Sequence, residues 1–457
     1  MNKFKQSLQF LISLVAALGL TWIVREPSFS QAQTYVLFLL CFSIGLWLTE
    51  AVPPFAVGLF IIAYLAFTLG SELFATTPQN VEIYLNTFSS SVIWLMMGGF
   101  FLASAMTKTR LDADLIRLTM KVCGSDPKRV LFGLMMVTMV FSMLISNTAT
   151  TAMVIAALMP LLVRLGKQSP VAKGLVLGIP IAATTGGMGT IIGSPPNAIA
   201  VGALVTAGQT LDFITWMYYG LPIALFLTWL SWRMLVKRFM AKTEPLSVDD
   251  SGPADVPVTR EFRAKRVTVA VILSVTLALW LTSPVHHLGA AAVSAIPLVF
   301  LPLSRILTSE DIRAIGWDTL ILVAGGLALG TALQQTGLLG VYAGRLASLQ
   351  VPNIVFYLVL AYATMLFSNV MSNTATSTVL IPLGMAILPA NGIEVCMIVG
   401  LSASTALFLP VSTPPNAIAY STGLIGQKDL RLGGLLMGLL GPALIICWVL
   451  LIGAMRG

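Results

Sequence analysis

The chain has 457 residues, of which 57% are hydrophobic and only 10% are charged. This composition excludes a soluble globular protein and predicts an all-α polytopic membrane protein. The net charge of +8 indicates no nucleic-acid function, because it follows from the way basic residues are placed between apolar stretches.

Apolar stretches long enough to cross a bilayer recur from end to end. Two more, at about 128–166 and 353–390, have polar centres, and we expect them to form re-entrant helical hairpins that enter and leave the membrane on one side. We expect about eleven transmembrane helices, at residues 8–24, 33–51, 54–70, 88–107, 172–208, 215–236, 266–283, 288–303, 318–333, 393–424 and 432–455.

An odd number of spans places the two termini on opposite sides of the membrane. With the N-terminus in the cytoplasm, only Arg25, Arg345 and Arg456 of the 26 Lys and Arg residues face outward. This asymmetry is what the positive-inside rule requires. We therefore expect a multi-pass protein of a bacterial inner (plasma) membrane, with the N-terminus cytoplasmic and the C-terminus outside.

Two polar motifs occur twice in this apolar chain. The stretch Phe141-Ser-Met-Leu-Ile-Ser-Asn-Thr-Ala-Thr150 returns at 367–376 with seven of its ten residues identical. Ser194-Pro-Pro-Asn-Ala-Ile-Ala200 returns at 413–419 with Thr413 in place of the serine. An odd number of spans separates the copies, so the two halves have opposite orientation. This pattern predicts inverted-topology repeats that build one site from two half-sites near the midplane.

A hydrophilic stretch, Ala241–Arg266, separates the two halves and is interpreted as a flexible cytoplasmic linker. On either side the features follow the same order. A span with a glycine pair comes first, at Gly98-Gly99 and Gly325-Gly326. A more polar helix, a hairpin, a span broken at Pro-Pro-Asn and a closing span follow in each half.

The repeated motifs carry neutral polar groups only. No Asp, Glu, Lys, Arg or His occurs within 132–163, 179–211 or 354–391. Helix N-termini in the hairpins suit a carboxylate, and unwound carbonyls beside Ser and Asn oxygens suit Na⁺. A site of this kind favours cation-coupled symport. An enzyme with Ser146 or Ser372 as nucleophile is excluded, because no base lies near either serine, and no catalytic residue is expected.

Other polar residues have simpler interpretations. Cys41, Cys123, Cys396 and Cys447 lie in or beside apolar spans without metal-ligand spacing, and we interpret them as unpaired fillers. His286-His287 is interpreted as a solvated pair in an outer turn. Glu50 is either a loop-facing carboxylate at the end of a span or a structural hydrogen-bonding group.

The chain resembles the divalent anion/sodium symporter family. The resemblance rests on the paired Ser-Asn-Thr motifs, the broken spans with Pro-Pro-Asn and the early Thr49-Glu-Ala-Val-Pro53, and it covers essentially the whole chain. It implies a homodimer that works as an elevator, in which a transport domain slides along a scaffold domain. The implied division is scaffold 1–125, transport 126–240, cytoplasmic linker 241–265, scaffold 266–350 and transport 351–457.

The resemblance also implies site residues, carried over position by position. The implied substrate contacts are Asn147, Thr148, Ser194, Pro195, Asn373, Thr374, Thr413 and Pro414. The first implied Na⁺ site consists of Ser142, Ser146, Asn147 and Gly193, and the second of Ser368, Ser372, Asn373 and Ser412. The second site is not equivalent to the first, because Ser412 takes the place of Gly193.

The sequence thus predicts a Na⁺-coupled symporter that imports C4-dicarboxylates such as succinate, malate and fumarate. Na⁺ is the coupling ion, and no other cofactor is expected. The alternative is a Na⁺-independent exchanger of dicarboxylates or citrate with the same fold. Neutral donors fit succinate, citrate, tartrate and sulfate alike, so the sequence leaves the substrate, the Na⁺ stoichiometry and the affinity open.

Overall fold

The computed structural model describes residues 3–75, 78–241, 259–338, 340–341, 344 and 351–456. Most of the expected linker, the end of the polar helix expected at 334–349, and Arg345 lie outside these residues. Every regular element in the described part is a helix, so the predicted fold class is confirmed.

The first half begins with α1 Lys3–Val24, α2 Gln31–Thr49, α3 Pro54–Gly70, α4 Glu82–Leu85, η1 Asn86–Ser89, α5 Ser91–Lys108 and α6 Leu111–Cys123. It continues with α7 Pro127–Ser142, α8 Asn147–Leu165, α9 Pro170–Gly187, α10 Pro195–Thr206 and α11 Phe213–Phe239.

The second half begins with α12 Arg260–Leu281, α13 Ser283–His286, α14 Ala290–Leu303, α15 Ser309–Arg313 and α16 Trp317–Gln335. It continues with α18 Asn353–Val370, α19 Asn373–Ile387, η2 Pro389–Asn391, α20 Gly392–Ala403, α21 Pro414–Ser421 and α22 Gln427–Arg456.

Each predicted span overlaps at least one of these helices. Within the described residues, nine helices are long and apolar enough to cross a membrane, and three shorter apolar ones accompany them. Two of the nine, α8 and α18, are arms of the predicted hairpins. The protein is therefore a multi-pass membrane protein, and the exact number of spans stays a prediction.

Helix ends follow capping residues in the sequence. Ser30 forms a capping box at the start of α2, and Asp126 caps α7 by accepting from the backbone N–H of Lys128. Glu50 ends α2 in the left-handed region, with φ of 50° and an exposed side chain. Of the two interpretations of Glu50, the structure therefore supports the loop-facing carboxylate.

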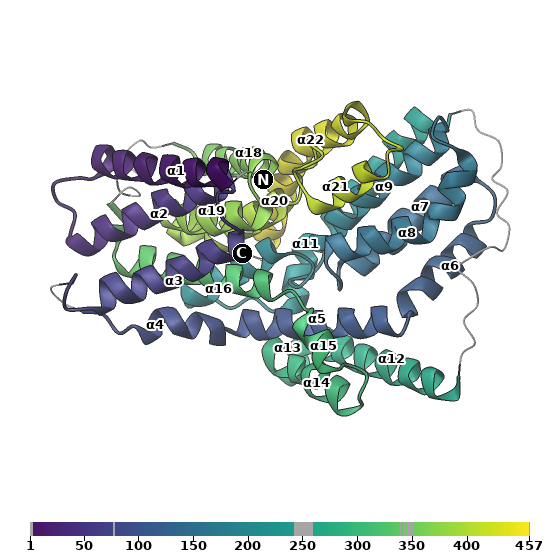
Figure 1. Ribbon diagram of the computed structural model, residues 1–457, viewed down its shortest axis with the longest axis horizontal. Coiled ribbons are helices and arrows are strands. Elements are labelled where there is room, and N and C mark those ends of the chain that lie inside the picture. Colours follow the sequence, from purple (N-terminus) through teal and green to yellow (C-terminus); the bar gives the residue numbers. More distant parts are fainter. Residues whose placement is uncertain are drawn as a thin grey trace.

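The helices pack in two groups. In one group α1 packs on α2, α2 on α3, α3 on α16, α5 on α14, and α12 on α14. The other group contains α7–α11 and α18–α22. Figure 1 shows the first hairpin, α7 and α8, in the right half of the view and the second, α18 and α19, in the left half. The groups meet where α16 packs against α10 and α19.

The broken spans cross between the two halves of the chain. Helix α10 follows the first break and packs against α19 and α20 of the second half. Helix α21 follows the second break and packs against α8 and α9 of the first half. The helix that follows each break therefore packs against the other repeat, and this packing connects the two half-sites.

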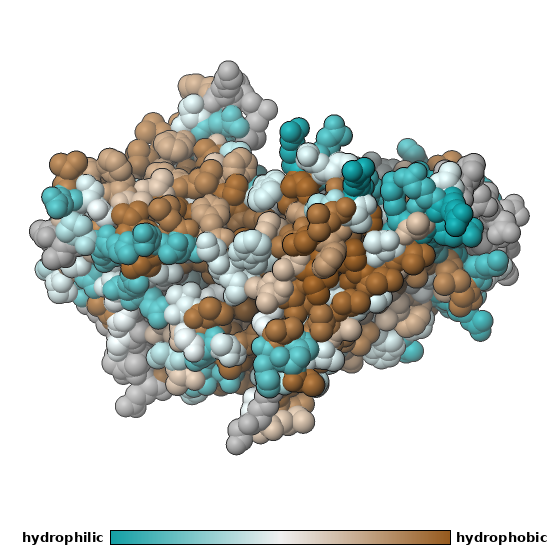
Figure 2. Space-filling model, turned by 90° about the horizontal axis from the view of Figure 1, so that it is seen from below, coloured by the Kyte–Doolittle hydropathy of each residue, from teal (hydrophilic) through white to brown (hydrophobic). Residues whose placement is uncertain are grey.

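The outer surface is largely apolar, as expected where lipid surrounds the protein. Helices α1 and α12 leave most of their apolar residues unburied. Figure 2 shows broad hydrophobic areas in both halves of one face and dense hydrophilic residues near the right-hand end.

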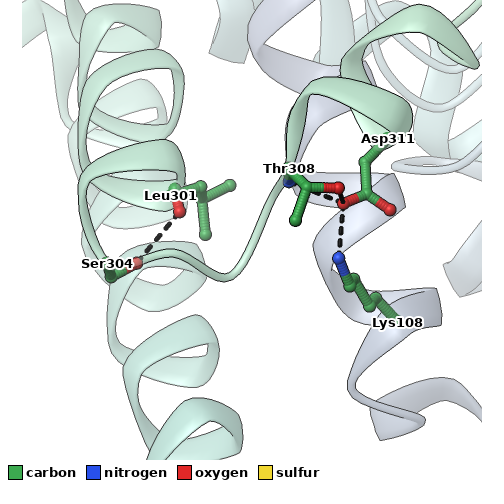
Figure 3. Close-up of polar contacts among 5 residues, drawn as sticks. All are labelled: Lys108, Leu301, Ser304, Thr308 and Asp311. Atoms are coloured by element: carbon green, nitrogen blue, oxygen red, sulfur yellow. Dashed lines mark hydrogen bonds and ion pairs between the residues drawn. The ribbon is translucent and has the colours of Figure 1, made fainter.

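Two ion pairs join the halves of the chain. Lys108 at the end of α5 pairs with Asp311 of α15, as Figure 3 shows, and Arg266 of α12 pairs with Asp114 of α6. Asp311 also accepts hydrogen bonds from the Thr308 N–H at 2.6 Å and hydroxyl at 2.7 Å. The pairs connect α5 to α15 and α6 to α12.

Candidate substrate and cation site

The first hairpin turns between α7 and α8 at residues 143–146. Ser146 is the N-cap of α8, and its hydroxyl accepts from the backbone N–H of Ala149 at 3.2 Å. This cap starts a new helix inside the apolar stretch. Asn147 and Thr148 therefore occupy the first turn of α8, where backbone N–H groups and about half a positive charge are available to an anion.

The loop between α9 and α10 is held by two polar side chains. The hydroxyl of Thr190 donates to the carbonyl of Met143 in the hairpin turn. The amide nitrogen of the fully buried Asn197 donates to the carbonyls of Gly187 and Thr190, at 2.7 Å each. The asparagine of Pro-Pro-Asn thus replaces the helical hydrogen bonds that the break removes.

An oxygen nest forms where this loop meets the hairpin. With its amide nitrogen turned toward the loop, Asn147 donates to Ser142 Oγ at 2.6 Å, Ala183 O at 3.2 Å and Gly193 O at 3.2 Å. A Cβ added at Gly187 would lie 2.7 Å from the nearer atom of the Asn147 side-chain amide, so only glycine leaves room. In this orientation the amide nitrogen satisfies the three oxygens. If the amide turns its Oδ1 toward them instead, the group becomes a set of neutral oxygens that suits Na⁺.

Three of the four residues predicted for the first Na⁺ site lie close together. Ser142, Asn147 and Gly193 meet in the nest. The hydroxyl of Ser146 caps α8.

The second half uses a different residue to join its hairpin to its loop. Asn369 Oδ1 accepts from the Phe408 N–H at 2.9 Å and from the Ser412 hydroxyl at 2.8 Å. Asn416 Nδ2 donates to the carbonyls of Leu407 and Leu409, at 3.1 and 3.0 Å. Asn416 therefore closes its loop in the same way as Asn197 closes the first.

The second predicted Na⁺ site contains buried oxygens that are not hydrogen-bonded. Ser368 Oγ and Asn373 Oδ1 have no hydrogen-bond partner in the described part of the chain. Ser372 caps α19 by accepting from the Ala375 N–H at 3.1 Å. Because the Ser412 hydroxyl is taken by Asn369, we expect its carbonyl, like that of Gly193, to be the oxygen that reaches a cation.

The predicted substrate residues share one kind of position. All lie at the N-cap or in the first turn of α8, α10, α19 or α21. Thr148 and Pro414 are exposed, Pro195 and Thr374 are half-buried, and Ser194 and Thr413 are buried, with Asn147 and Asn373 half-buried beside them. The N-termini of four helices thus carry the predicted contacts, an arrangement that can bind an anion without a basic side chain.

Sequence reasoning missed several residues of this arrangement. Asn197 and Asn416 were detectable, because the asparagine of Pro-Pro-Asn is itself repeated. Asn369 was not, because Met143 occupies its place in the first copy. Ala183 contributes only a backbone carbonyl, for which a side chain gives no signal.

A separate cavity of about 610 Å³ lies between α10, α16 and α19. Its walls include Ala203, Leu327 and Pro382 and the neutral side chains of Gln209 and Gln334. None of the predicted site residues is among the residues that line it. It lies where the two groups of helices meet, away from the hairpin turns.

The histidines and cysteines are the other side chains that could bind a metal ion. The His286 ring contacts the Leu279 carbonyl at 2.8 Å and accepts from the Leu288 N–H at 3.0 Å. The four cysteines are free thiols. Within the described residues, no group of three or more His, Cys, Asp or Glu residues could hold a metal ion.

Comparisons with known proteins identify the family to which the chain is similar. The citrate transporter family matches residues 44–395. The sodium-dependent dicarboxylate transporter SdcS of Staphylococcus saprophyticus is 28% identical, over 93% of this chain and 88% of that protein. Its namesake in Staphylococcus aureus strain NCTC 8325 is 29% identical, over 90% of this chain and 84% of that protein.

Solved structures show the same fold at low identity. The Alcanivorax borkumensis YdaH transporter superposes with a TM-score of 0.55 and 16% identity, over 88% of this chain and 97% of that one. Neisseria gonorrhoeae MtrF superposes with a TM-score of 0.58 and 11% identity, over 90% and 97%.

Proposed function

The chain belongs to the citrate transporter family, and on that premise we propose that it is a Na⁺-coupled symporter that imports C4-dicarboxylates such as succinate, malate and fumarate. It is a membrane transporter and not an enzyme. The sodium-dependent dicarboxylate transporters that it resembles along most of their length support both the cation and the substrate class.

The observation that carries the proposal is the oxygen nest around Asn147. Ser142 Oγ, Ala183 O and Gly193 O surround its amide nitrogen within 3.2 Å. The nest contains no charged group, so a bound Na⁺ would supply the positive charge. It lies at the start of α8, where Asn147 and Thr148 can contact a carboxylate.

Charge balance explains why a neutral site needs the cation. Moving a dianion into a cell at about −100 mV costs about 4.6 kcal/mol, since each charge contributes about 2.3 kcal/mol. Two Na⁺ ions would cancel this electrical cost, and their own gradient would then drive uptake. We assign Ser142, Ser146, Asn147 and Gly193 to one ion, and Ser368, Ser372, Asn373 and Ser412 to the other.

We further propose that the two helix groups move relative to each other as an elevator. The moving group would be residues 126–240 and 351–457, and the static group 1–125 and 266–350. The static group would form a homodimer, with the N-terminus in the cytoplasm and the C-terminus outside. The packing of α10 and α21 into opposite repeats supports the idea, because both half-sites would travel as one unit.

The test is uptake of radiolabelled succinate by purified protein in liposomes, with an inward Na⁺ gradient or with choline. Asn147→Ala and Asn373→Ala are compared with Asn353→Ala, an exposed asparagine at the start of α18. We expect uptake that needs Na⁺, is lost in both site variants and survives in the control. Equal uptake in choline, seen only when dicarboxylate is preloaded inside, would instead identify an exchanger.

A further inference from the structure

Buried hydroxyl groups gather in the second half-site without hydrogen bonds. Ser377, Ser402 and Ser404 are fully buried, and their Oγ atoms have no partner in the described part of the chain. Ser and Thr inside helices ordinarily donate to the carbonyl four residues earlier. Thr364 and Thr378 on the same hairpin do so, at 2.6 and 2.9 Å. The unpaired serines are therefore exceptions that call for a ligand.

The packing of α19 on α20 places two of these serines opposite each other. A Cβ built at Gly384 would lie 2.6 Å from Val395 Cγ1, which fixes the antiparallel register. Ser377 lies seven residues before Gly384, and Ser402 lies seven residues after Val395. Seven residues are about two helical turns, so both serines return to the facing sides at one level, about 10 Å from that contact.

The predicted cation ligands lie at this level or one helical turn from it. The Gly384 Cβ position is also 3.0 Å from Leu360 Cδ1 of α18, and Ser368 lies eight residues beyond Leu360. Asn373 precedes Ser377 by four residues and so shares its face of α19. Helix register thus puts Ser368 near this level on α18 and Asn373 one turn closer to the hairpin tip. Ser368 Oγ and Asn373 Oδ1 are both buried and unpaired.

The first half-site lacks part of this set. Counting back from the two Pro-Pro-Asn motifs, Ser402 corresponds to Ala183 and Ser404 to Thr185. Ala183 has no hydroxyl, and the Thr185 hydroxyl is bonded to Thr228 Oγ1 at 2.7 Å. Thr151 matches Ser377 and is likewise buried and unpaired. The second half-site therefore has more oxygens free for a cation.

We propose that the hydroxyls of Ser377 and Ser402 complete the oxygen shell of the Na⁺ in the second half-site, so that this site binds Na⁺ more tightly than the first and fills before it. The inference rests on the proposed function, since it assigns further ligands to one of its two cation sites. A hard cation satisfies several buried neutral oxygens at once, and neither thiols nor imidazoles are needed.

The test measures Na⁺ binding without substrate, as the rise in unfolding temperature of purified protein when NaCl replaces choline chloride at constant ionic strength. A ligand that binds only the folded state raises its stability with concentration. Ser402→Ala and Ser377→Ala are compared with Ser43→Ala. Ser43 is also fully buried with an unpaired hydroxyl, but it lies in α2.

We expect each site variant to raise the Na⁺ concentration for half-maximal stabilisation about tenfold, which corresponds to about 1.4 kcal/mol, while Ser43→Ala leaves it unchanged. Succinate uptake in the same variants should need correspondingly more Na⁺. If the parent responds to Na⁺ and both site variants match it, water fills the space and the inference is wrong while the proposed function stands. If the parent shows neither Na⁺ stabilisation nor Na⁺-dependent uptake, both fail.

Discussion

The hydroxyl of Ser412 donates a 2.8 Å hydrogen bond to the side-chain oxygen of Asn369. This bond joins the broken span of the second half to the hairpin beside it. In the first half Thr190 makes the corresponding link, but to the backbone carbonyl of Met143. The two half-sites thus share a plan, in which a loop hydroxyl is tied to a hairpin, and differ in the groups that make the tie.

Asn369→Leu should loosen the second loop. The Phe408 N–H and the Ser412 hydroxyl both lose their acceptor, and because this region is only partly buried we expect a loss of about 1 kcal/mol in stability. Succinate uptake should fall more than stability does, since the loop carries Ser412 and Thr413. Thermal unfolding and uptake measured on the same preparation check this, and unchanged uptake would contradict it.

Gly187→Ala should abolish Na⁺-dependent uptake. The new methyl group would lie 2.7 Å from the nearer atom of the Asn147 side-chain amide and 3.1 Å from the Gly193 carbonyl oxygen, so the oxygen nest must widen. Gly19→Ala in α1 is the control, because a Cβ there meets nothing within 4 Å. Initial uptake rates at varied Na⁺ are the measurement, and a variant with normal Na⁺ dependence would show that the nest is not the cation site.

Asn197→Asp and Asn416→Asp should destabilise the protein equally. Each replaces a buried amide donor by an oxygen that faces two loop carbonyls, and a loss of about 3 kcal/mol or more is expected for an uncompensated buried charge. Asn353→Asp, on an exposed asparagine, should have little effect. The unfolding temperatures of the three variants are the measurement. A stable Asn416→Asp would show that the second loop does not depend on its asparagine as the first loop does.

Asp311→Asn should lower stability by up to about 1 kcal/mol, because the Lys108–Asp311 pair is partly exposed. Burial acts to raise the pKa of Asp311, but hydrogen bonds from Lys108 and Thr308 outweigh it and hold the pKa below its ordinary value. A carboxylate with a lowered pKa stabilises the fold at neutral pH and loses this effect as the pH falls through its folded-state pKa.

The stability difference between parent and Asp311→Asn should therefore be constant from pH 7 to about pH 5 and shrink below about pH 4. Unfolding temperatures across this range are the measurement. Asp126→Asn is the control, since Asp126 also lies at a helix N-terminus, as the N-cap of α7, but its pair with Arg129 is largely exposed. A difference that grows on acidification would contradict the assignment.

The sequence alone determined the helical class, the order of the elements and the position of both breaks. Apolar length, Pro-Pro pairs and capping serines act locally, so residues such as Ser146, Ser372 and Pro195 mark helix starts without any tertiary context. The duplication pointed to Asn147 and Asn373 because neutral polar groups are costly at membrane depth unless they bind something.

Only the tertiary structure decided which oxygens converge. The Ala183 carbonyl is a ligand candidate because α9 packs against the hairpin, and Asn369 joins hairpin to loop although its counterpart in the first half is Met143. Gly384 lets α19 approach α20 at Val395, and the proposed pairing of Ser377 with Ser402 follows from that register. Such meetings depend on helix register and close packing between distant segments. A local sequence pattern does not predict such contacts.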